Sequence, residues 1–401
     1  MNQVRNEEKN IQRSGNADVI PEKKPERKQK PGGRCLLLLV LTALAALLAL
    51  LAVSTWRSYN TLQVNQYEYT SEKVGVPLRI CVLSDLHDHS FGEENSRLIK
   101  QVLETDPDLI IMAGDMLNED SGDDTIPVTL VRSLRAAMNL EDTAGAGEAV
   151  NREDTAGTGE TMNREDTAGT GETMNRESTA GSGETAIYYA LGNAEMAFME
   201  QHPEIDLMGD LKEAGAEVLE STMQDLNFAA PESSTQDSEA AARSAGEADD
   251  ADESDFVVPG AESTRIRLGG LYAYPFGSDG NDSSESAPAE VRSYLDDFED
   301  TDALKILAAH RPESFCFGDA AEVRDIDLVI SGHDHGGQVI LPFIGGLYAG
   351  DQGFFPKYVH GFYRIGGTEL FVTSGLGSGR ELLPRFNNPP EIAVIDILPE
   401  S

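Results

Sequence analysis

Cysteine is scarce in this chain of 401 residues, which has only three. Cys35, Cys81 and Cys316 are widely separated, and their spacing fits neither a disulfide framework nor a zinc knuckle. We therefore expect three unpaired thiols, and any metal site must draw on other side chains.

Positive charge is also scarce, with 31 lysines and arginines against 70 acidic residues and a net charge of −39. Such a surface repels nucleic acid, and aromatic residues make up only 6% of the chain, so no basic or aromatic platform for bases is evident. This disfavours a nuclease, and we expect no nucleic acid partner. Acidic substrates would need bound cations to hold them.

One apolar run is long enough to cross a membrane. Residues 35–53 (CLLLLVLTALAALLALLAV) carry no charge, and a spanning helix needs about 20 such residues. Basic residues precede the run, and Trp56 and Tyr59 follow it. The positive-inside rule then predicts a single-pass protein of the cell membrane, with a disordered basic tail (1–34) in the cytoplasm and the remainder extracytoplasmic. A cleaved signal peptide is the alternative, but the basic region and the run are both long for one.

Two low-complexity stretches interrupt a globular pattern that extends over 78–398. The first (141–185) repeats a unit such as EDTAGTGETMNR with almost no apolar side chain, which predicts a flexible surface insert rather than a ligand-binding repeat. The second (229–262) is acidic without a periodic apolar face, which indicates disorder. Because these inserts carry much of the negative charge, the total says little about an active site.

Short apolar runs of strand type are followed, five times in chain order, by residues that bind metals. The residues after the runs are Asp85 and His87, then Asp115, Asn193, His310, and finally His333 and His335. Between the first two runs, apolar residues recur at helical spacing, which predicts a β-α-β unit. Open α/β sheets bind ligands at the carboxyl ends of their strands. Four of only seven histidines fall at these positions, so we expect one shared metal site.

The residue types indicate the chemistry of such a site. Carboxylate oxygen and imidazole nitrogen together suit Mn, Fe or Zn ions better than a thiolate-seeking metal. A carboxylate can bridge two ions, and two ions about 3.5–4 Å apart can clamp a phosphoryl group and lower the pKa of a bound water to give a hydroxide nucleophile. The set therefore predicts a metal cluster, and one that holds two divalent metal ions could act on a phosphate ester.

The motifs resemble those of the calcineurin-like metallophosphoesterase family. The matching segments are SDLH (84–87), AGD (113–115), LGN (191–193), AHRPE (309–313) and SGHDHGGQ (331–338). The tail, with SGLGSG from Ser374 and RFNNPPEI from Arg385, is similar to that of a membrane-associated bacterial branch. The resemblance covers most of the chain after Leu78 except the inserts.

The resemblance implies an α/β fold, a four-layer α/β/β/α sandwich, and it assigns roles to residues. Asp85, His87 and His335 would hold one ion, the second would be held by Asn193, His310 and His333, and Asp115 would bridge the two. Asp115 and Asn193 are thus candidate catalytic residues as well as ligands.

Arg311 is a third candidate catalytic residue. A guanidinium matches phosphate geometry, so Arg311 could contact the phosphate. The equal alternative is a turn residue paired with a carboxylate.

One position departs from the family pattern. After the asparagine the family has a histidine that assists the leaving group, but this chain has Ala194, followed by Glu195. General acid catalysis contributes about 10²–10⁴-fold, so we expect slow turnover or a restricted substrate range. His89 is a possible substitute, although a solvated loop position is the simpler expectation for it, and Glu195 is expected to be structural.

We therefore predict an extracytoplasmic, metal-dependent phosphoesterase acting on mono- or diesters. The anchor favours substrates at the membrane or in the envelope, such as lipid-linked phosphates. The alternative is a metal-binding pseudoenzyme or interaction scaffold, whose catalysis is weakened because Ala194 replaces the usual catalytic histidine. Because every expected ligand is present, we favour catalysis.

Overall fold

The computed structural model describes residues 33–149, 178–179, 185–229, 263–272, 287–379 and 383–400. Nearly all of the predicted basic tail, most of the repeat insert and nearly all of the acidic insert lie outside these described residues. The chain divides into two units, Met1–Leu50 and Leu51–Ser401. The second unit contains every predicted metal ligand.

The predicted membrane segment lies within one long helix, α1 (Gly33–Asn60). Its stretch Leu37–Asn60 has 24 residues, and an 18-residue window within it has a mean hydropathy of 2.8 and no burial. The helix is therefore long and apolar enough to cross a membrane. The helix continues beyond the predicted end at Val53. Its last ten residues belong to the second unit, which begins at Leu51.

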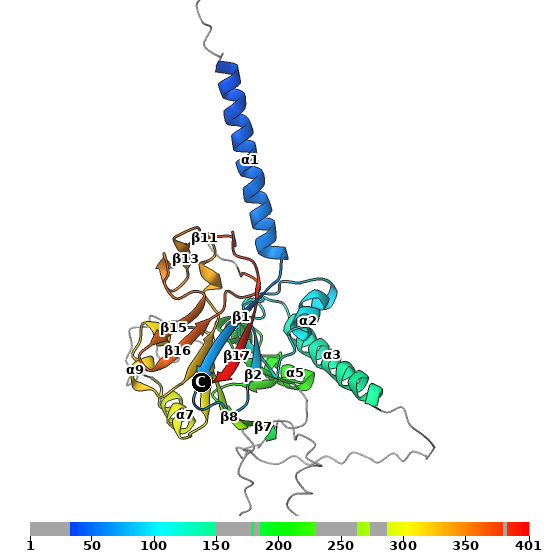
Figure 1. Cartoon of the computed structure of the whole chain (residues 1–401), viewed down its shortest axis with the longest axis vertical. Coiled ribbons are helices and arrows are strands. Elements are labelled where there is room, and N and C mark those ends of the chain that lie inside the picture. Colours follow the sequence, from blue (N-terminus) through cyan, green and yellow to red (C-terminus); the bar gives the residue numbers. More distant parts are fainter. Residues whose placement is uncertain are drawn as a thin grey trace, which may run out of the picture. The chain divides into compact units, whose positions relative to one another are not determined.

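Two mixed β-sheets form the centre of the second unit (Figure 1). The first has the order β1 (Gln63–Ser71), β17 (Glu391–Pro399), β2 (Leu78–Leu83), β3 (Leu109–Ala113), β5 (Ala186–Ala190) and β6 (Glu217–Leu219). The second has the order β15 (Gly361–Ile365), β16 (Thr368–Val372), β10 (Leu328–Ser331), β9 (Leu304–Ala309), β8 (Ser263–Leu271), β7 (Met223–Ala229) and β4 (Ser178–Thr179). Strands β2, β3 and β5 run parallel to one another, as do β8, β9 and β10.

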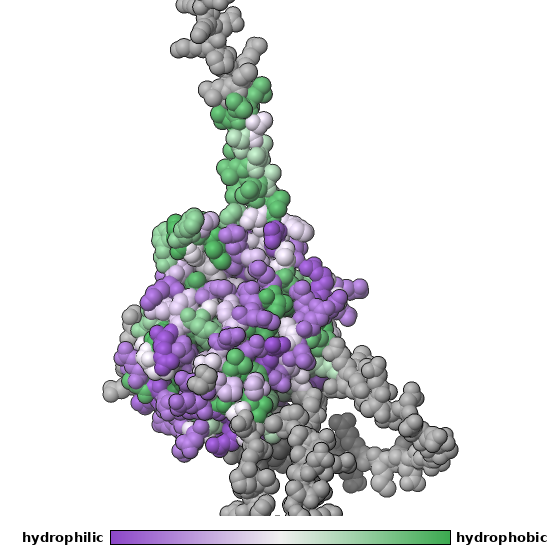
Figure 2. Space-filling model, viewed as in Figure 1, coloured by the Kyte–Doolittle hydropathy of each residue, from purple (hydrophilic) through white to green (hydrophobic). Residues whose placement is uncertain are grey.

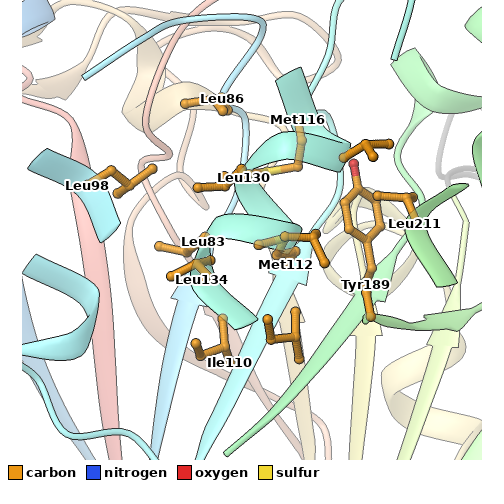
Figure 3. Packing of buried hydrophobic residues seen from close by; sticks show 14 of the residues in the cluster. Leu83, Leu86, Leu98, Ile110, Met112, Met116, Leu130, Leu134, Tyr189 and Leu211 are labelled. Carbon is orange, nitrogen blue, oxygen red and sulfur yellow. The ribbon is translucent and has the colours of Figure 1, made fainter. Parts of the chain in front are cut away.

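Helices cover the outer face of each sheet. The first sheet packs against α2 (Ser96–Leu103), α3 (Thr125–Ala149), α4 (Asn193–Gln201) and α5 (Leu207–Ala214), and the second against α7 (Ala289–Glu299), α8 (Glu313–Cys316) and α9 (Ala320–Val323). Successive strand residues point to opposite faces, so Ile110 joins the helix-covered core seen in Figure 3 while Ile111 joins the core between the sheets. The predicted four-layer α/β/β/α sandwich is confirmed.

Short elements complete the described part of the fold. The 3₁₀ turns are η1 (Glu93–Asn95) and η3 (His335–Gly337), and two hairpins pair β11 (Ile340–Leu341) with β12 (Gly345–Gly346) and β13 (Tyr348–Ala349) with β14 (Gly353–Phe354). Two elements overlap the predicted repeat insert. Helix α3 continues to Ala149, beyond the predicted boundary at residue 141, and β4 pairs with β7.

Glu391 ties the edge of the first sheet to the loop after β16. Its side chain is buried, one carboxylate oxygen accepts bonds from Tyr67 Oη (2.6 Å) and His360 Nε2 (3.0 Å), and the other accepts from Thr373 Oγ1 (2.8 Å) and Ser374 N (2.7 Å). Burial alone would raise the pKa of Glu391, but the hydrogen bonds, that of His360 foremost, lower it to about 2.

Glu391→Gln should destabilise the fold by up to about 3 kcal/mol at pH 7, because each pKa unit of difference between folded and unfolded states is worth about 1.4 kcal/mol. The folded-state pKa lies below the ordinary value of 4.5, so this stabilisation exists above about pH 4.5 and is lost as the pH falls toward 2. Urea unfolding at pH 7 and pH 3 measures the free energy of unfolding of both proteins. The difference in this free energy between wild type and variant should be smaller at pH 3. Glu369→Gln, at a surface pair with Arg364, is the control and should change little. A gap that is equal at both pH values would contradict the assignment.

Candidate metal centre

The seven predicted ligands gather where the carboxyl ends of strands from both sheets meet. Asp85, His87, Asp115 and Asn193 follow β2, β3 and β5 of the first sheet, and His310, His333 and His335 follow β9 and β10 of the second. Six of them form two groups whose possible ligand atoms lie within 4.8 Å of one another, namely Asp85, His87 and His335, and Asp115, His310 and His333. The first group holds the residues that the resemblance assigns to one ion, and the second holds two of the three assigned to the other, with Asp115 rather than Asn193 as its third member. The assignment of ligands to ions stays a prediction.

Asp115 belongs to the second group and also approaches the first. Its Oδ2 is 3.2 Å from His310 Nε2 and 3.7 Å from His87 Nε2, and these histidines belong to different groups. Its Oδ1 accepts a hydrogen bond of 2.8 Å from Ala194 N, which fixes the orientation of the carboxylate. One carboxylate therefore reaches both groups, as a bridging ligand must.

Backbone carbonyls fix the tautomers of two histidines. His310 Nδ1 lies 2.7 Å from Ala113 O, and His335 Nδ1 lies 3.1 Å from Gly377 O. A carbonyl only accepts, so each Nδ1 must carry a proton and donate it. The neutral ring then has its lone pair on Nε2, the atom that faces the carboxylates of Asp115 or Asp85. Histidines that ligate metals are oriented in this way.

Two of the predicted ligands carry buried polar atoms without a hydrogen bond. Neither ring nitrogen of His87 nor Oδ1 of Asn193 has a hydrogen-bond partner within the described ranges. A buried polar atom left in this state costs about 1–3 kcal/mol. A divalent cation would satisfy Asn193 Oδ1 and one ring nitrogen of His87, so the residues present fit a metal centre.

The backbone at the site is strained. Five ligands adopt left-handed conformations, with φ of 55° at Asp85, 49° at His87, 54° at Asp115, 74° at His333 and 46° at His335. For residues other than glycine such conformations cost of order 1–3 kcal/mol each and cluster at functional sites. The strained residues lie in the tight turns that follow β2, β3 and β10, where the chain leaves the regular strand conformation.

Two glycines allow the ligand loops to approach closely. A Cβ at Gly192 would lie 2.1 Å from Asp115 Oδ1, and one at Gly332 would lie 2.4 Å from Asp85 Oδ2. Both distances are shorter than van der Waals contact. The glycines in LGN and SGH are therefore required because the carboxylates occupy the space a side chain would fill.

Neighbouring histidines and carboxylates shift one another's pKa values within the site. Burial alone would lower the pKa of His310, but the adjacent carboxylates of Asp115 and Asp85 raise it to about 10. Burial opposes ionisation of Asp115, yet His310 and His87 hold its pKa well below the usual range. Burial lowers the pKa of His335 to about 3, so that ring is neutral and able to offer a lone pair.

Glu195 holds the turns that carry Asp115 and Asn193. Its buried carboxylate accepts bonds of 2.8 Å from the backbone N–H groups of Asp115, Met116 and Gly192, and one of 2.8 Å from Tyr189 Oη. These bonds join the turn after β3 to the turn after β5. The structural role expected for Glu195 agrees with this arrangement.

Arg311 is buried beside the site and contacts the carboxylates of Asp351 and Glu313. This is the carboxylate-paired alternative, and the phosphate contact stays a prediction. Asp351 also contacts His333 Nε2, and Glu313, His333 and Asp351 form a third group of possible ligands. Motif reasoning missed Asp351 because it lies in the turn between β13 and β14, outside every family segment.

His89 does not face the site as a free acid. Its Nε2 lies 2.8 Å from Tyr59 O, and its ring packs edge-on against Phe91. Ala194 is 3% exposed, and its backbone N–H rather than its side chain serves the site. No described contact therefore places His89 where the missing histidine would act.

Comparisons with known proteins support the motif analysis over part of the chain. No family model matches. The uncharacterized metallophosphoesterase YkuE of Bacillus subtilis (strain 168) is 38% identical over 96 residues, which are 23% of this chain and 31% of YkuE. The phosphodiesterase YaeI of Escherichia coli (strain K12) is 30% identical over 94 residues, 23% of this chain and 32% of YaeI.

The chain thus spans about a third of the length of these curated relatives. Among solved structures, the calcineurin-like phosphoesterase YfkN from Bacillus subtilis aligns over 80% of this chain and 84% of that chain, with 14% identity and a TM-score of 0.29. The sequence matches confirm the predicted relationship to metallophosphoesterases over the shared stretch.

His333→Ala and Asp115→Ala should each weaken Mn²⁺ binding by about tenfold or more, because each removes a side chain that is predicted to bind the metal directly. Metal content after dialysis, measured by mass spectrometry on the purified chain, tests this. His202→Ala is the matched control, since His202 ends α4 and pairs with exposed Glu204. Unchanged metal content in both site variants would contradict the site.

Proposed function

We propose that this protein is a metal-dependent phosphoesterase that hydrolyses phosphate mono- or diesters at the outer side of a membrane. The observation that carries the proposal is the position of Asp115, whose Oδ2 lies 3.2 Å from His310 Nε2 in one group of candidate ligands and 3.7 Å from His87 Nε2 in the other. A carboxylate shared by two such groups suits a dinuclear metal site.

The donor set suits Mn, Fe or Zn ions, because it combines carboxylate, imidazole and amide donors and contains no thiolate. When bound, two such ions supply an activated water and stabilise charge on a phosphoryl group. The chain's own residues orient that chemistry. Ala113 O and Gly377 O fix the orientation of the His310 and His335 rings, and Glu195 holds the turn that carries Asp115.

Arg311 is the residue we assign to the phosphate. Its side chain is anchored by Asp351 and Glu313, and Asp351 also contacts His333. The guanidinium therefore lies next to the second group of ligands. A planar, permanently charged group can pair with two phosphate oxygens at once.

Helix α1 supports a location at the membrane. Its apolar stretch is long enough to span, and basic residues precede it, so we assign the N-terminus to the cytoplasm and the second unit to the outside. Substrates at or near the bilayer, such as lipid head groups, lipid-linked sugar phosphates or envelope polymers, then have the shortest path to the site. YaeI is named a phosphodiesterase, which supports testing diesters first.

The competing function is a metal-binding pseudoenzyme, and Ala194 is the observation that favours it. All seven expected ligands are retained around strained turns. Backbone strain of this kind has a cost that a scaffold would not need to bear. We therefore favour catalysis with a missing general acid.

The full chain with Mn²⁺ should hydrolyse nitrophenyl phosphate esters at least about 100-fold faster than matched alkyl esters. A nitrophenolate leaves without a proton, but an alkoxide does not, and the acid that would protonate it contributes about 10²–10⁴-fold. The kcat/KM values for the two ester types measure the ratio, for mono- and diesters separately. Failure to hydrolyse any ester with metal bound would favour the pseudoenzyme.

Ala194→His should raise kcat/KM for alkyl esters by about 10²-fold, with little change for nitrophenyl esters. Position 194 is not a predicted ligand, so metal content should stay constant. Because Ala194 is 3% exposed, a larger side chain can cost about 1–3 kcal/mol of stability, and unfolding curves must accompany the kinetics.

Ala194→Asn is the matched control for that variant, since it adds comparable bulk without a group that titrates near neutral pH. Equal gains for both ester types would mean that the new histidine mainly binds phosphate. No gain in a folded, metal-loaded variant would contradict the missing-acid explanation.

A further inference from the structure

Two hairpins expose large apolar side chains next to the metal centre. Phe343 and Ile344 lie in the turn between β11 and β12, and Phe354 and Phe355 lie at the end of the β13–β14 hairpin. Their exposed fractions are 108%, 62%, 63% and 62%. We call these four residues the hairpin patch. Figure 2 shows hydrophobic surface where Figure 1 labels β11 and β13.

The hairpins are fixed to the metal centre by backbone bonds. Leu347 N, between the two hairpins, donates to Gly337 O (3.1 Å) and Val339 O (2.9 Å), and Phe355 N donates to Leu347 O (2.9 Å). Gly337 closes the turn η3 that carries His335. The patch is thus the outer surface of the segment that supplies a predicted ligand.

The same segment is bonded to the end of α1. Asn388 N donates to Ser58 Oγ (3.1 Å), and Asn388 Nδ2 donates to His335 O (2.6 Å). Ile340 N, in β11, donates to Phe386 O (2.9 Å). Residues 386–388 therefore connect the last turn of α1, the ligand turn and the first hairpin within one unit.

This connection sets where a bilayer would lie. The candidate span reaches Asn60, and Trp56, one turn earlier, is 63% exposed. Tryptophan at the end of a spanning helix lies at the boundary between hydrocarbon and water. Ser58, the residue bonded to the 386–388 segment, comes two positions after Trp56, so that boundary falls close to the hairpins.

We propose that the hairpin patch inserts into the interfacial layer of the lipid bilayer that α1 crosses. This inference rests on the proposed membrane location. Three of the four side chains are aromatic, and such residues partition to the interface because they are apolar over most of their surface. The four side chains of the patch are uncharged, so apolar burial is the driving force that they offer.

Insertion of the patch would bring the metal centre to the head-group layer. A phosphate ester on a lipid could then reach the ligands without leaving the bilayer. The substrate class that fits this placement is a lipid-linked phosphate ester rather than a soluble metabolite.

Single tryptophans can report the depth of the patch in the full chain. The chain has one tryptophan, so Trp56→Phe gives a silent background, into which Phe343→Trp and Phe355→Trp are placed one at a time. Val323→Trp is the matched control, since Val323 is an apolar residue, 56% exposed, on α9 over the outer face of the second sheet. Each variant is reconstituted into phosphatidylcholine vesicles with and without brominated acyl chains.

We expect bromolipid to quench the tryptophans at 343 and 355 at least about threefold more than the one at 323, because only interfacial side chains approach the acyl chains. Equal quenching at the three positions would overturn the proposal. Blue-shifted emission at 343 without bromolipid quenching would also overturn it, and would indicate that a second copy covers the patch.

Two further readouts separate this inference from the proposed function. Flotation of the wild-type chain with the vesicles tests the anchor, and hydrolysis of a soluble nitrophenyl diester by the same samples tests catalysis. Strong quenching without hydrolysis would leave the patch intact and refute the esterase. Hydrolysis with flotation but without quenching would refute the patch alone, and hydrolysis without flotation would refute both the anchor and the patch.

Discussion

The contact of Asp115 with histidines from both ligand groups is the interaction on which the site depends. His87 comes from the first sheet and His310 from the second, and both imidazoles lie within 4 Å of the same carboxylate oxygen. The sheets can bring these groups together only because the parallel strands of each end at the same side of the sandwich. The four-layer packing therefore has a chemical consequence, since it fixes the distance between two sets of ligands that are far apart in sequence.

Holding charged and strained groups together needs support, and buried carboxylates provide it. Glu195 accepts the backbone N–H groups of the turns after β3 and β5, while Glu391 accepts that of Ser374 at the opposite side of the site. Burial raises the pKa of Glu195, whereas the partners of Glu391 lower its pKa to about 2. One group has mainly backbone donors and the other has a histidine, so the same residue type is stabilised in different ways.

The strands that carry ligands were predictable because each is a mostly apolar run, buried on both faces, with a metal-binding residue type within a few positions of its end. Strand β1 was not, because Gln63–Ser71 is an edge strand with mostly polar exposed positions, and its inner face offers only the partly buried Tyr67 and Tyr69, which is a weak signal. Asp351 was missed for a different reason. It reaches His333 only through the fold of a short hairpin, and nothing in its local sequence indicates that contact. The left-handed conformations at the ligands likewise follow from tertiary packing rather than from propensity.

The tail motif RFNNPPEI shows how a family signature can be structural. The buried guanidinium of Arg385 donates to Ser374 O (2.9 Å) and Gly377 O (2.7 Å), and Gly377 O is the acceptor that fixes the ring of His335. Burial lowers the pKa of Arg385 to about 10, against the opposing effect of Asp85 and Glu391, so the guanidinium stays charged at neutral pH. Arg385 N meanwhile donates to Tyr59 Oη (3.0 Å) at the end of α1. The motif thus ties the orientation of a ligand to the end of the candidate membrane helix.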